Sequence, residues 1–119
     1  MSILKDKSFA FAVRIVKLYK HLTEAKKEFI LSKQLLRSGT SVGALIREAQ
    51  NAESKPDFIH KLAIAQKECN ETLYWLELVK ETNYITQKEY ESIYPEAIAL
   101  LKMIRSSILT TRRNITHDS

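Results

Sequence analysis

The sequence predicts an all-α protein, an antiparallel up-down-up-down four-helix bundle that forms a single domain over residues 1–119. Two glycines and two prolines in 119 residues are too few for the many turns of a β-protein. Apolar residues recur at alternating spacings of three and four, the period of amphipathic helices. Four such stretches with short connections favour antiparallel neighbours. The helices are expected at residues 5–23, 28–51, 55–82 and 87–113, before a frayed tail at 114–119.

An apolar stripe defines each of the first two helices. The first helix is expected from the series Leu4, Ser8, Phe11, Ile15, Leu18 and Leu22. The second helix keeps the same rhythm through Leu31, Leu35, Ser38, Val42, Leu45, Ala49 and Ala52. Because residues three and four apart share one face of a helix, each series forms a surface that can pack against the other helices.

Start signals support the third and fourth helices. Ser54 can cap the third helix, and Pro56 lies in its first turn. The run Thr-Gln-Lys-Glu at residues 86–89 is a capping box for the fourth. Pro95 lies within the fourth stretch, where it removes one backbone hydrogen bond and crowds the preceding turn. We therefore expect either a kink at Pro95 or a helix that begins near Tyr94.

Both glycines lie inside the second helix. Gly39 and Gly43 are four residues apart and share one face. Each costs about 1 kcal/mol relative to alanine in a helix interior, so a packing gain must offset it. The missing side chains allow another helix to approach closely, from the same bundle or from a second subunit. A phosphate-binding loop is disfavoured, because Ala44 and Leu45 stand where its motif requires lysine and a hydroxyl residue.

The third helix has more apolar residues than one core stripe uses, and Trp75 lies off that stripe. A helix that is apolar on several faces is buried on several faces. We therefore expect a homo-oligomer, with Gly39, Gly43 and Trp75 as candidates for helix packing or subunit contact. The alternative is a wide core within one subunit.

Catalytic and metal-binding motifs are not recognisable. A di-metal bundle needs two Glu-x-x-His motifs and two further glutamates, whereas the nearest match here is the single pair Asp57 and His60. Cys69, the one cysteine, lies on the core stripe of the third helix, where a small buried side chain is expected. We expect a non-enzymatic protein without metal or cofactor, and no small-molecule substrate is evident.

The candidates for a buried polar contact are Arg37, Glu48 and Glu71. Glu48 and Glu71 lie near the inward edges of the second and third helices. A buried carboxylate needs a partner, which Arg37 or Arg47 could supply. The alternative is that both acids are exposed.

The compartment is expected to be the cytoplasm. A single cysteine permits no internal disulfide, which fits a reducing environment. No apolar run approaches the roughly 20 residues of a membrane span. The first eleven residues, MSILKDKSFAF, lack the arrangement of a secretion signal.

Distinctive runs occur within residues 34–79: QLLRS, TSVGA, ESKPDFIHKL and IAQKECNETLYWL. Together they resemble the bacterial four-helix-bundle proteins encoded by intervening sequences within large-subunit ribosomal RNA genes. The resemblance implies a small bundle that assembles into a ring, commonly a pentamer. A more distant branch is similar to the basic accessory proteins of diversity-generating retroelements, which associate with nucleic acid and a reverse transcriptase. Many members carry an Asn-Ile-Ala-Glu-Gly-like run at the position of residues 45–49, where this chain introduces Arg47 as an extra cation.

The net charge of +5 suggests a nucleic-acid partner, and the cations gather towards the two ends of the chain. In an up-down-up-down bundle, both termini and the link between the second and third helices meet at one end. The candidate residues there are Arg47, Lys55, Lys61, Arg105, Arg112 and Arg113. The first hypothesis is a homo-oligomer that binds RNA or DNA through this end with little sequence specificity. The alternative is a protein–protein scaffold or adaptor whose charge serves solubility alone.

Overall fold

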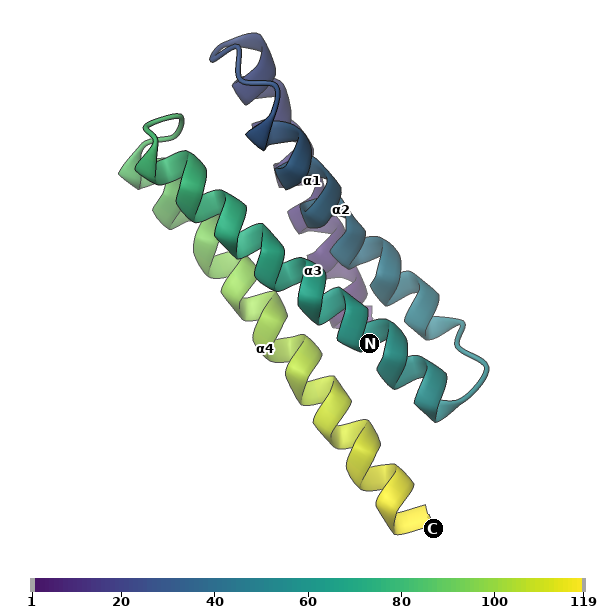
Figure 1. Cartoon of the computed structure of the whole chain (residues 1–119). Coiled ribbons are helices and arrows are strands. Elements are labelled where there is room, and N and C mark those ends of the chain that lie inside the picture. Colours follow the sequence, from purple (N-terminus) through teal and green to yellow (C-terminus); the bar gives the residue numbers. More distant parts are fainter. Residues whose placement is uncertain (1, 119) are drawn as a thin grey trace.

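The four expected helices are present in the computed structural model, which describes residues 2–118 except for the side chains of residues 2, 117 and 118. They are α1 (Ser2–Glu24), α2 (Leu31–Gln50), α3 (Lys55–Glu81) and α4 (Gln87–Asp118). Consecutive helices run antiparallel and pack side by side (Figure 1). α4 also contacts α1, but less extensively than the consecutive pairs contact each other. The predicted all-α four-helix bundle is therefore confirmed.

The helix starts on either side of the first connection differ from the prediction. α1 begins at Ser2 rather than at residue 5, because no glycine or proline interrupts its first turn. α2 begins at Leu31 rather than at residue 28. Glu28 lies before the helix and caps it, since its carboxylate accepts hydrogen bonds from the backbone N–H groups of Ile30, Leu31 and Ser32. These are donors that the helix itself leaves unpaired.

The caps of α3 and α4 are as the sequence predicts. The hydroxyl of Ser54 accepts a hydrogen bond from the backbone N–H of Asp57 at 3.2 Å. Thr86 and Glu89 bond reciprocally: the Glu89 N–H donates to the Thr86 hydroxyl at 3.1 Å, and the Thr86 N–H donates to the Glu89 carboxylate at 2.8 Å. Both capping motifs satisfy backbone donors locally, so the starts of these helices could be predicted without tertiary information.

Pro95 lies inside a continuous helix. α4 begins at Gln87 and passes through Pro95, so the alternative that it begins near Tyr94 is wrong. The proline leaves the preceding turn short of one hydrogen bond. Arg14 of α1 donates to that turn, with distances of 3.0 Å to the carbonyl oxygen of Ser92 and 2.8 Å to its hydroxyl. The carbonyl group that the proline leaves without its helical partner is that of Glu91, and the bonds from Arg14 tie the next residue, Ser92, to α1.

The C-terminal tail is helical. α4 continues to Asp118, so the predicted fraying at residues 114–119 is wrong for residues 114–118, and residue 119 lies outside the described part. No glycine or proline follows Pro95 in this segment, and nothing in its sequence ends the helix. Figure 1 shows this last part of α4 projecting past the link between α2 and α3.

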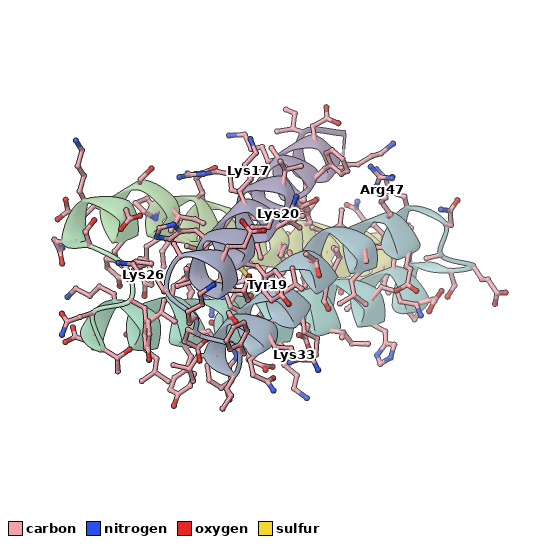
Figure 2. The ribbon with its side chains drawn as sticks, turned by 90° about the horizontal axis from the view of Figure 1, so that it is seen from above. Lys17, Tyr19, Lys20, Lys26, Lys33 and Arg47 are labelled. Carbon is pink, nitrogen blue, oxygen red and sulfur yellow. The ribbon has the colours of Figure 1, made fainter. Side chains whose placement is uncertain are left out.

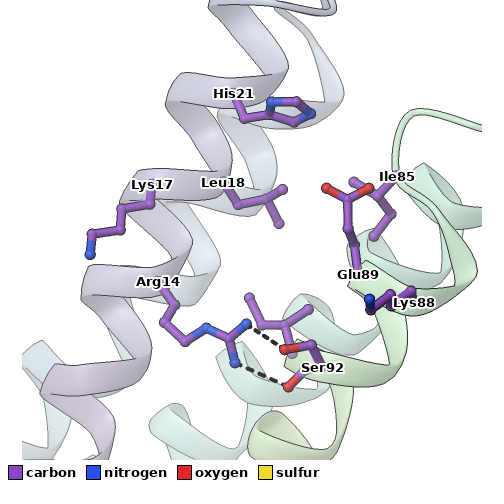
Figure 3. Close-up of a pocket in the computed structure, with 9 residues that line it drawn as sticks. Arg14, Lys17, Leu18, His21, Ile85, Lys88, Glu89 and Ser92 are labelled. Atoms are coloured by element: carbon purple, nitrogen blue, oxygen red, sulfur yellow. Dashed lines mark hydrogen bonds between the residues drawn. The ribbon is translucent and has the colours of Figure 1, made fainter.

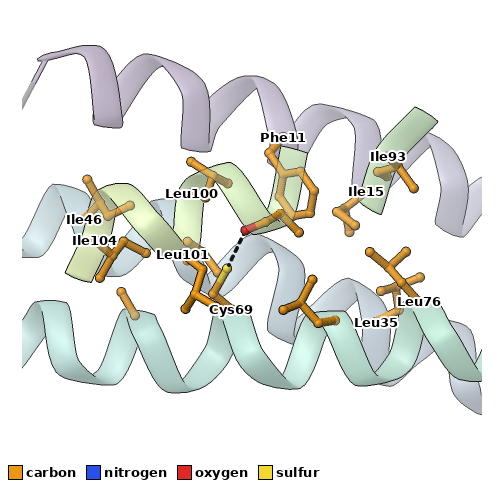
Figure 4. Packing of buried hydrophobic residues seen from close by; sticks show 14 of the residues in the cluster. Phe11, Ile15, Leu35, Ile46, Cys69, Leu76, Ile93, Leu100, Leu101 and Ile104 are labelled. Carbon is orange, nitrogen blue, oxygen red and sulfur yellow. Dashed lines mark hydrogen bonds between the residues drawn. The ribbon is translucent and has the colours of Figure 1, made fainter. Parts of the chain in front are cut away.

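One core runs through the bundle, with side chains from all four helices (Figure 4). Phe11, Leu35, Leu76 and Ile104 come from α1, α2, α3 and α4 and are almost completely buried. Cys69 lies within this core, and its thiol donates to a backbone carbonyl oxygen of α4 at 3.3 Å. Burial raises the pKa of this thiol to about 11, against a smaller opposing effect of Arg105. The cysteine is therefore a buried packing residue.

α1 packs against the two glycines of α2. A Cβ atom built on Gly39 would lie 2.8 Å from Cγ1 of Ile15, and one built on Gly43 would lie 3.3 Å from the backbone oxygen of Ser8. Both glycines are buried. The close helix approach predicted from their spacing therefore occurs within the bundle, between α1 and α2.

Candidate nucleic-acid interface

The net positive charge is concentrated in the N-terminal part of the chain. Residues 2–50, which form α1, α2 and their link, carry ten Lys or Arg and four Asp or Glu. Residues 51–119, which contain α3 and α4, carry nine Lys or Arg and ten Asp or Glu. Because α1 packs against α2 along the bundle, the whole positive excess lies on one side of the molecule.

Five exposed cations of α1, α2 and the link between them share one face, which we call the basic face. Figure 2 looks onto this face and labels its cations Lys17, Lys20, Lys26, Lys33 and Arg47. All five side chains are exposed. Those of Lys17, Lys20 and Lys33 make no hydrogen bond or ion pair with any described residue. They are therefore free to meet an external anion.

Arg47 lies at the edge of an apolar strip on the same face. Its guanidinium carbon is 5.2 Å from the centre of the Phe9 ring, which is 55% exposed. Val13 and Val16 follow Phe9 at helical spacing and are 38% and 36% exposed. The strip Phe9, Val13 and Val16 occupies the N-terminal half of α1, and the basic-face lysines of this helix, Lys17 and Lys20, follow it.

The cations predicted at the end of the bundle are present at or near that end, but acids accompany them. Figure 1 shows the N-terminus, the α2–α3 link and the C-terminus at the same end. Of the six predicted residues, Lys61 is partly buried and the other five are exposed. Glu53 and Asp57 lie at the same link, where the Asp57 carboxylate accepts from the Glu53 N–H at 3.2 Å. The helices that carry the basic face, with their link, have ten cations against four acids, so this side is the more uniformly positive.

The expected polar contact between α2 and α3 is a partly exposed ion pair. Arg37 binds Glu71, and its Nη1 atom lies 3.1 Å from Oε2 of Glu68. Trp75 packs against the core and donates from its indole N–H to Glu71 at 3.3 Å. Burial opposes ionisation of Glu71, but hydrogen bonds from Arg37 and Trp75 outweigh it and lower the pKa. The Arg37 side chain is 51% exposed.

Glu48 does not take part in this contact. The residue is exposed on α2, so Glu48 is not the buried polar residue for which it was a candidate, and the alternative of an exposed acid holds for it. Its position near the end of α2 has no partner helix over it, because α1 and α3 pack on the other faces. Arg37 instead contacts two acids of α3, Glu71 and Glu68. The sequence pattern did not single out Glu68.

A cleft of about 710 Å³ lies between α1 and α4, which contact each other less extensively than the consecutive helices do (Figure 3). Its apolar lining comes from Leu18, Ile85 and Ile93. In Figure 3, His21 and Glu89 face each other across the opening, while Lys17 points away from it. Arg14 spans the cleft through its bonds to Ser92 and an ion pair with Glu96.

Two further properties bear on the kind of site. Among the side chains that the structure describes, those of residues 3–116, no three His, Cys, Asp or Glu are grouped so that they could hold a metal ion. Of the helices formed by the same residues, none is both long and apolar enough to cross a membrane.

The chain is similar to one protein family and to a solved structure. Residues 2–106 match the family model of the 23S rRNA-intervening sequence protein. A crystal structure from Bacteroides thetaiotaomicron VPI-5482, described as a protein with unknown function from the S23 ribosomal protein family, is 59% identical in sequence. The match covers 88% of this chain and 97% of that chain, with a TM-score of 0.87. No curated protein matches the chain.

Proposed function

Since the chain belongs to the 23S rRNA-intervening sequence protein family, we propose that it is a non-enzymatic, homo-oligomeric bundle that binds RNA through its basic face. The observation that carries the proposal is the set of exposed lysines on α1 and α2 without ionic partners in the described chain. The family's name refers to 23S rRNA, which favours RNA over DNA as the polyanion.

Phosphate contacts supply the binding energy in this proposal. A lysine that neutralises a phosphate releases counterions from the nucleic acid, so affinity falls steeply as salt rises. Phosphates carry no sequence information, and the basic face offers lysine ammonium groups rather than a set of base-reading side chains. Binding is therefore expected to tolerate many sequences. Arg47 belongs both to this face and to the bundle end predicted from the sequence.

Self-association is supported by the exposed strip of Phe9, Val13 and Val16. Within one subunit these three side chains of α1 remain exposed, Phe9 at 55%, Val13 at 38% and Val16 at 36%. A second copy that covered this strip would remove apolar surface from water, at about 25 cal/mol per Å². A ring, such as the pentamer implied by the resemblance, would repeat the basic face around its circumference. Light scattering that gives the mass of a monomer for the wild type would refute this part of the proposal.

The RNA-binding part is tested by fluorescence anisotropy with labelled RNA over a series of salt concentrations. The triple variant Lys17→Glu, Lys20→Glu and Lys33→Glu removes the three lysines without partners. A control with the same charge change, Lys67→Glu, Lys88→Glu and Lys102→Glu, alters exposed residues of α3 and α4. If three phosphate contacts are lost, the slope of log affinity against log salt falls by about 2 to 3 in the first variant. The control should retain a slope close to that of the wild type.

Three results would contradict the proposal or its choice of site. Absence of binding by the wild type at low salt would favour the alternative of a protein–protein scaffold. An equal loss in both triple variants would mean that net charge, rather than this face, attracts RNA. In the same assay, Arg112→Glu with Arg113→Glu tests the bundle end. A loss confined to that double variant would move the site from the basic face to the end.

A further inference from the structure

The connection between α1 and α2 presents two large apolar side chains to solvent. Phe29 is 60% exposed and Ile30 is 76% exposed, at the end of the link formed by residues 25–30. Both residues lie outside the helices, so neither belongs to an apolar helical stripe. Helix amphipathicity therefore does not explain their exposure.

We call Phe29 and Ile30 the tip of the α1–α2 link. The link holds this tip in a defined conformation. The Glu28 carboxylate is buried and accepts hydrogen bonds from three backbone N–H groups, at 3.0 Å from Ile30, 2.9 Å from Leu31 and 2.7 Å from Ser32. The backbone N–H of Glu28 donates to the carbonyl oxygen of Leu22 at 2.9 Å. The backbone of Glu28 is thus bonded to α1 and its carboxylate to the start of α2, so the backbone that carries Phe29 and Ile30 is fixed at both ends.

Cations surround the tip. Lys26 and Lys27 precede Phe29 and Ile30, Lys33 follows in the first turn of α2, and all three lysines are exposed. Glu28, which directly precedes Phe29 in the chain, is buried, and its carboxylate accepts three backbone hydrogen bonds. Figure 2 shows Lys26 and Lys33 on the side of the molecule that carries the basic face. A tip of one aromatic and one aliphatic side chain, flanked by lysines, suits a partner that carries negative charge and also has flat apolar surfaces.

The size of the tip argues against a protein partner. Two side chains offer apolar area on the order of 300 Å², whereas a stable interface buries about 800 Å² on each partner. A membrane-surface site needs a wider apolar face than one phenylalanine and one isoleucine provide. An unpaired nucleotide fits better, because a base stacks on a single aromatic ring while its phosphates meet neighbouring cations.

We propose that the α1–α2 link binds unpaired nucleotides of RNA, with Phe29 stacking on a base and Lys26, Lys27 and Lys33 contacting the flanking phosphates. The inference rests on the RNA-binding function proposed above and names the class of RNA, one with single-stranded segments. The basic face attracts any RNA by charge, and the tip distinguishes unpaired bases from duplex.

The test compares labelled single-stranded RNA and duplex RNA of the same length in the anisotropy assay. Phe29→Leu retains an apolar side chain but removes the aromatic ring, whereas Phe29→Trp retains the ring. Phe29→Leu should weaken single-stranded binding about tenfold, in line with stacking on one base, and leave duplex binding unchanged. Phe29→Trp should bind single strands at least as well as the wild type. Tyr74→Leu, at an aromatic residue of α3 that is 57% exposed, is the control and should change neither affinity.

Specific outcomes overturn the inference. Wild-type affinity of Phe29→Leu for single strands would show that no base stacks there. A change in oligomeric mass on Phe29→Leu would make the tip a subunit contact. Binding to phosphatidylserine vesicles that disappears in Phe29→Leu would make it a membrane contact. If the wild type binds duplex RNA and Phe29→Leu has no effect, only this inference fails, whereas absence of binding to either RNA refutes the proposed function itself.

Discussion

The close approach of α1 to α2, where Ile15 meets Gly39, gives a sharp prediction for Gly39→Ala. A Cβ atom at residue 39 would lie 2.8 Å from Cγ1 and 2.9 Å from Cγ2 of Ile15. Ile15 is fully buried and branched at Cβ, so it cannot move these atoms by rotating a flexible end. α1 must therefore shift outward or Ile15 must leave its preferred rotamer.

Two opposing effects set the magnitude. Overpacking a buried site costs about 1–3 kcal/mol. Alanine gains about 1 kcal/mol over glycine in helix propensity. We therefore expect Gly39→Ala to lower the free energy of unfolding by about 1 kcal/mol. In an Ile15→Ala background the obstructing atoms are absent, so the same substitution should become stabilising by about 1 kcal/mol. The change of sign is the diagnostic result.

Urea unfolding followed by far-ultraviolet circular dichroism measures both effects. Ala44→Gly, at an exposed residue of α2, measures the propensity difference in this helix without a packing contribution. If Gly39→Ala stabilises the otherwise wild-type protein by as much as Ala44→Gly destabilises it, α1 does not press on Gly39. The reasoning would also fail if the substitution had the same effect in both backgrounds.

Three further predictions concern polar and buried groups. Burial opposes ionisation of Glu28, but its backbone hydrogen bonds outweigh this and lower its pKa. Its stabilisation is therefore complete above the unfolded-state pKa and is lost as pH falls through the lower folded-state pKa, so acid unfolding should be less steep in Glu28→Gln. The Arg37–Glu71 pair is partly exposed, and a double-mutant cycle should give a coupling of no more than about 1 kcal/mol. Cys69, with a pKa raised to about 11 by burial, should react with a thiol reagent at neutral pH only as fast as the protein opens.

Features that depend on neighbouring residues in the chain could be predicted from the sequence. The Ser54 cap of α3 and the reciprocal box of Thr86 and Glu89 were predictable because residues within one turn supply both partners. The Glu28 cap was missed, although its bonds are local as well. The signal was an acid just ahead of an apolar run, but Glu28 was assigned to the helix that it caps.

Contacts between distant residues could not be predicted in the same way. Arg14 and Ser92 are separated by 78 positions, and periodicity alone does not pair one helical residue with another. The same limit applies to Glu68, which joins Glu71 as a partner of Arg37, and to Glu48, a candidate for burial that is exposed. A stripe shows which face of a helix packs, but not which side chain it meets.

The sequence by itself determined that four amphipathic helices form and where α3 and α4 begin, because hydrophobic period and capping depend on residues within a few turns. It also determined that Gly39 and Gly43 leave space on one face of α2. Only the tertiary structure decided that Ile15 and Ser8 of α1 fill that space. It also placed Lys17, Lys20 and Lys33 on one face, because the charge of a surface depends on how the helices are arranged around the core.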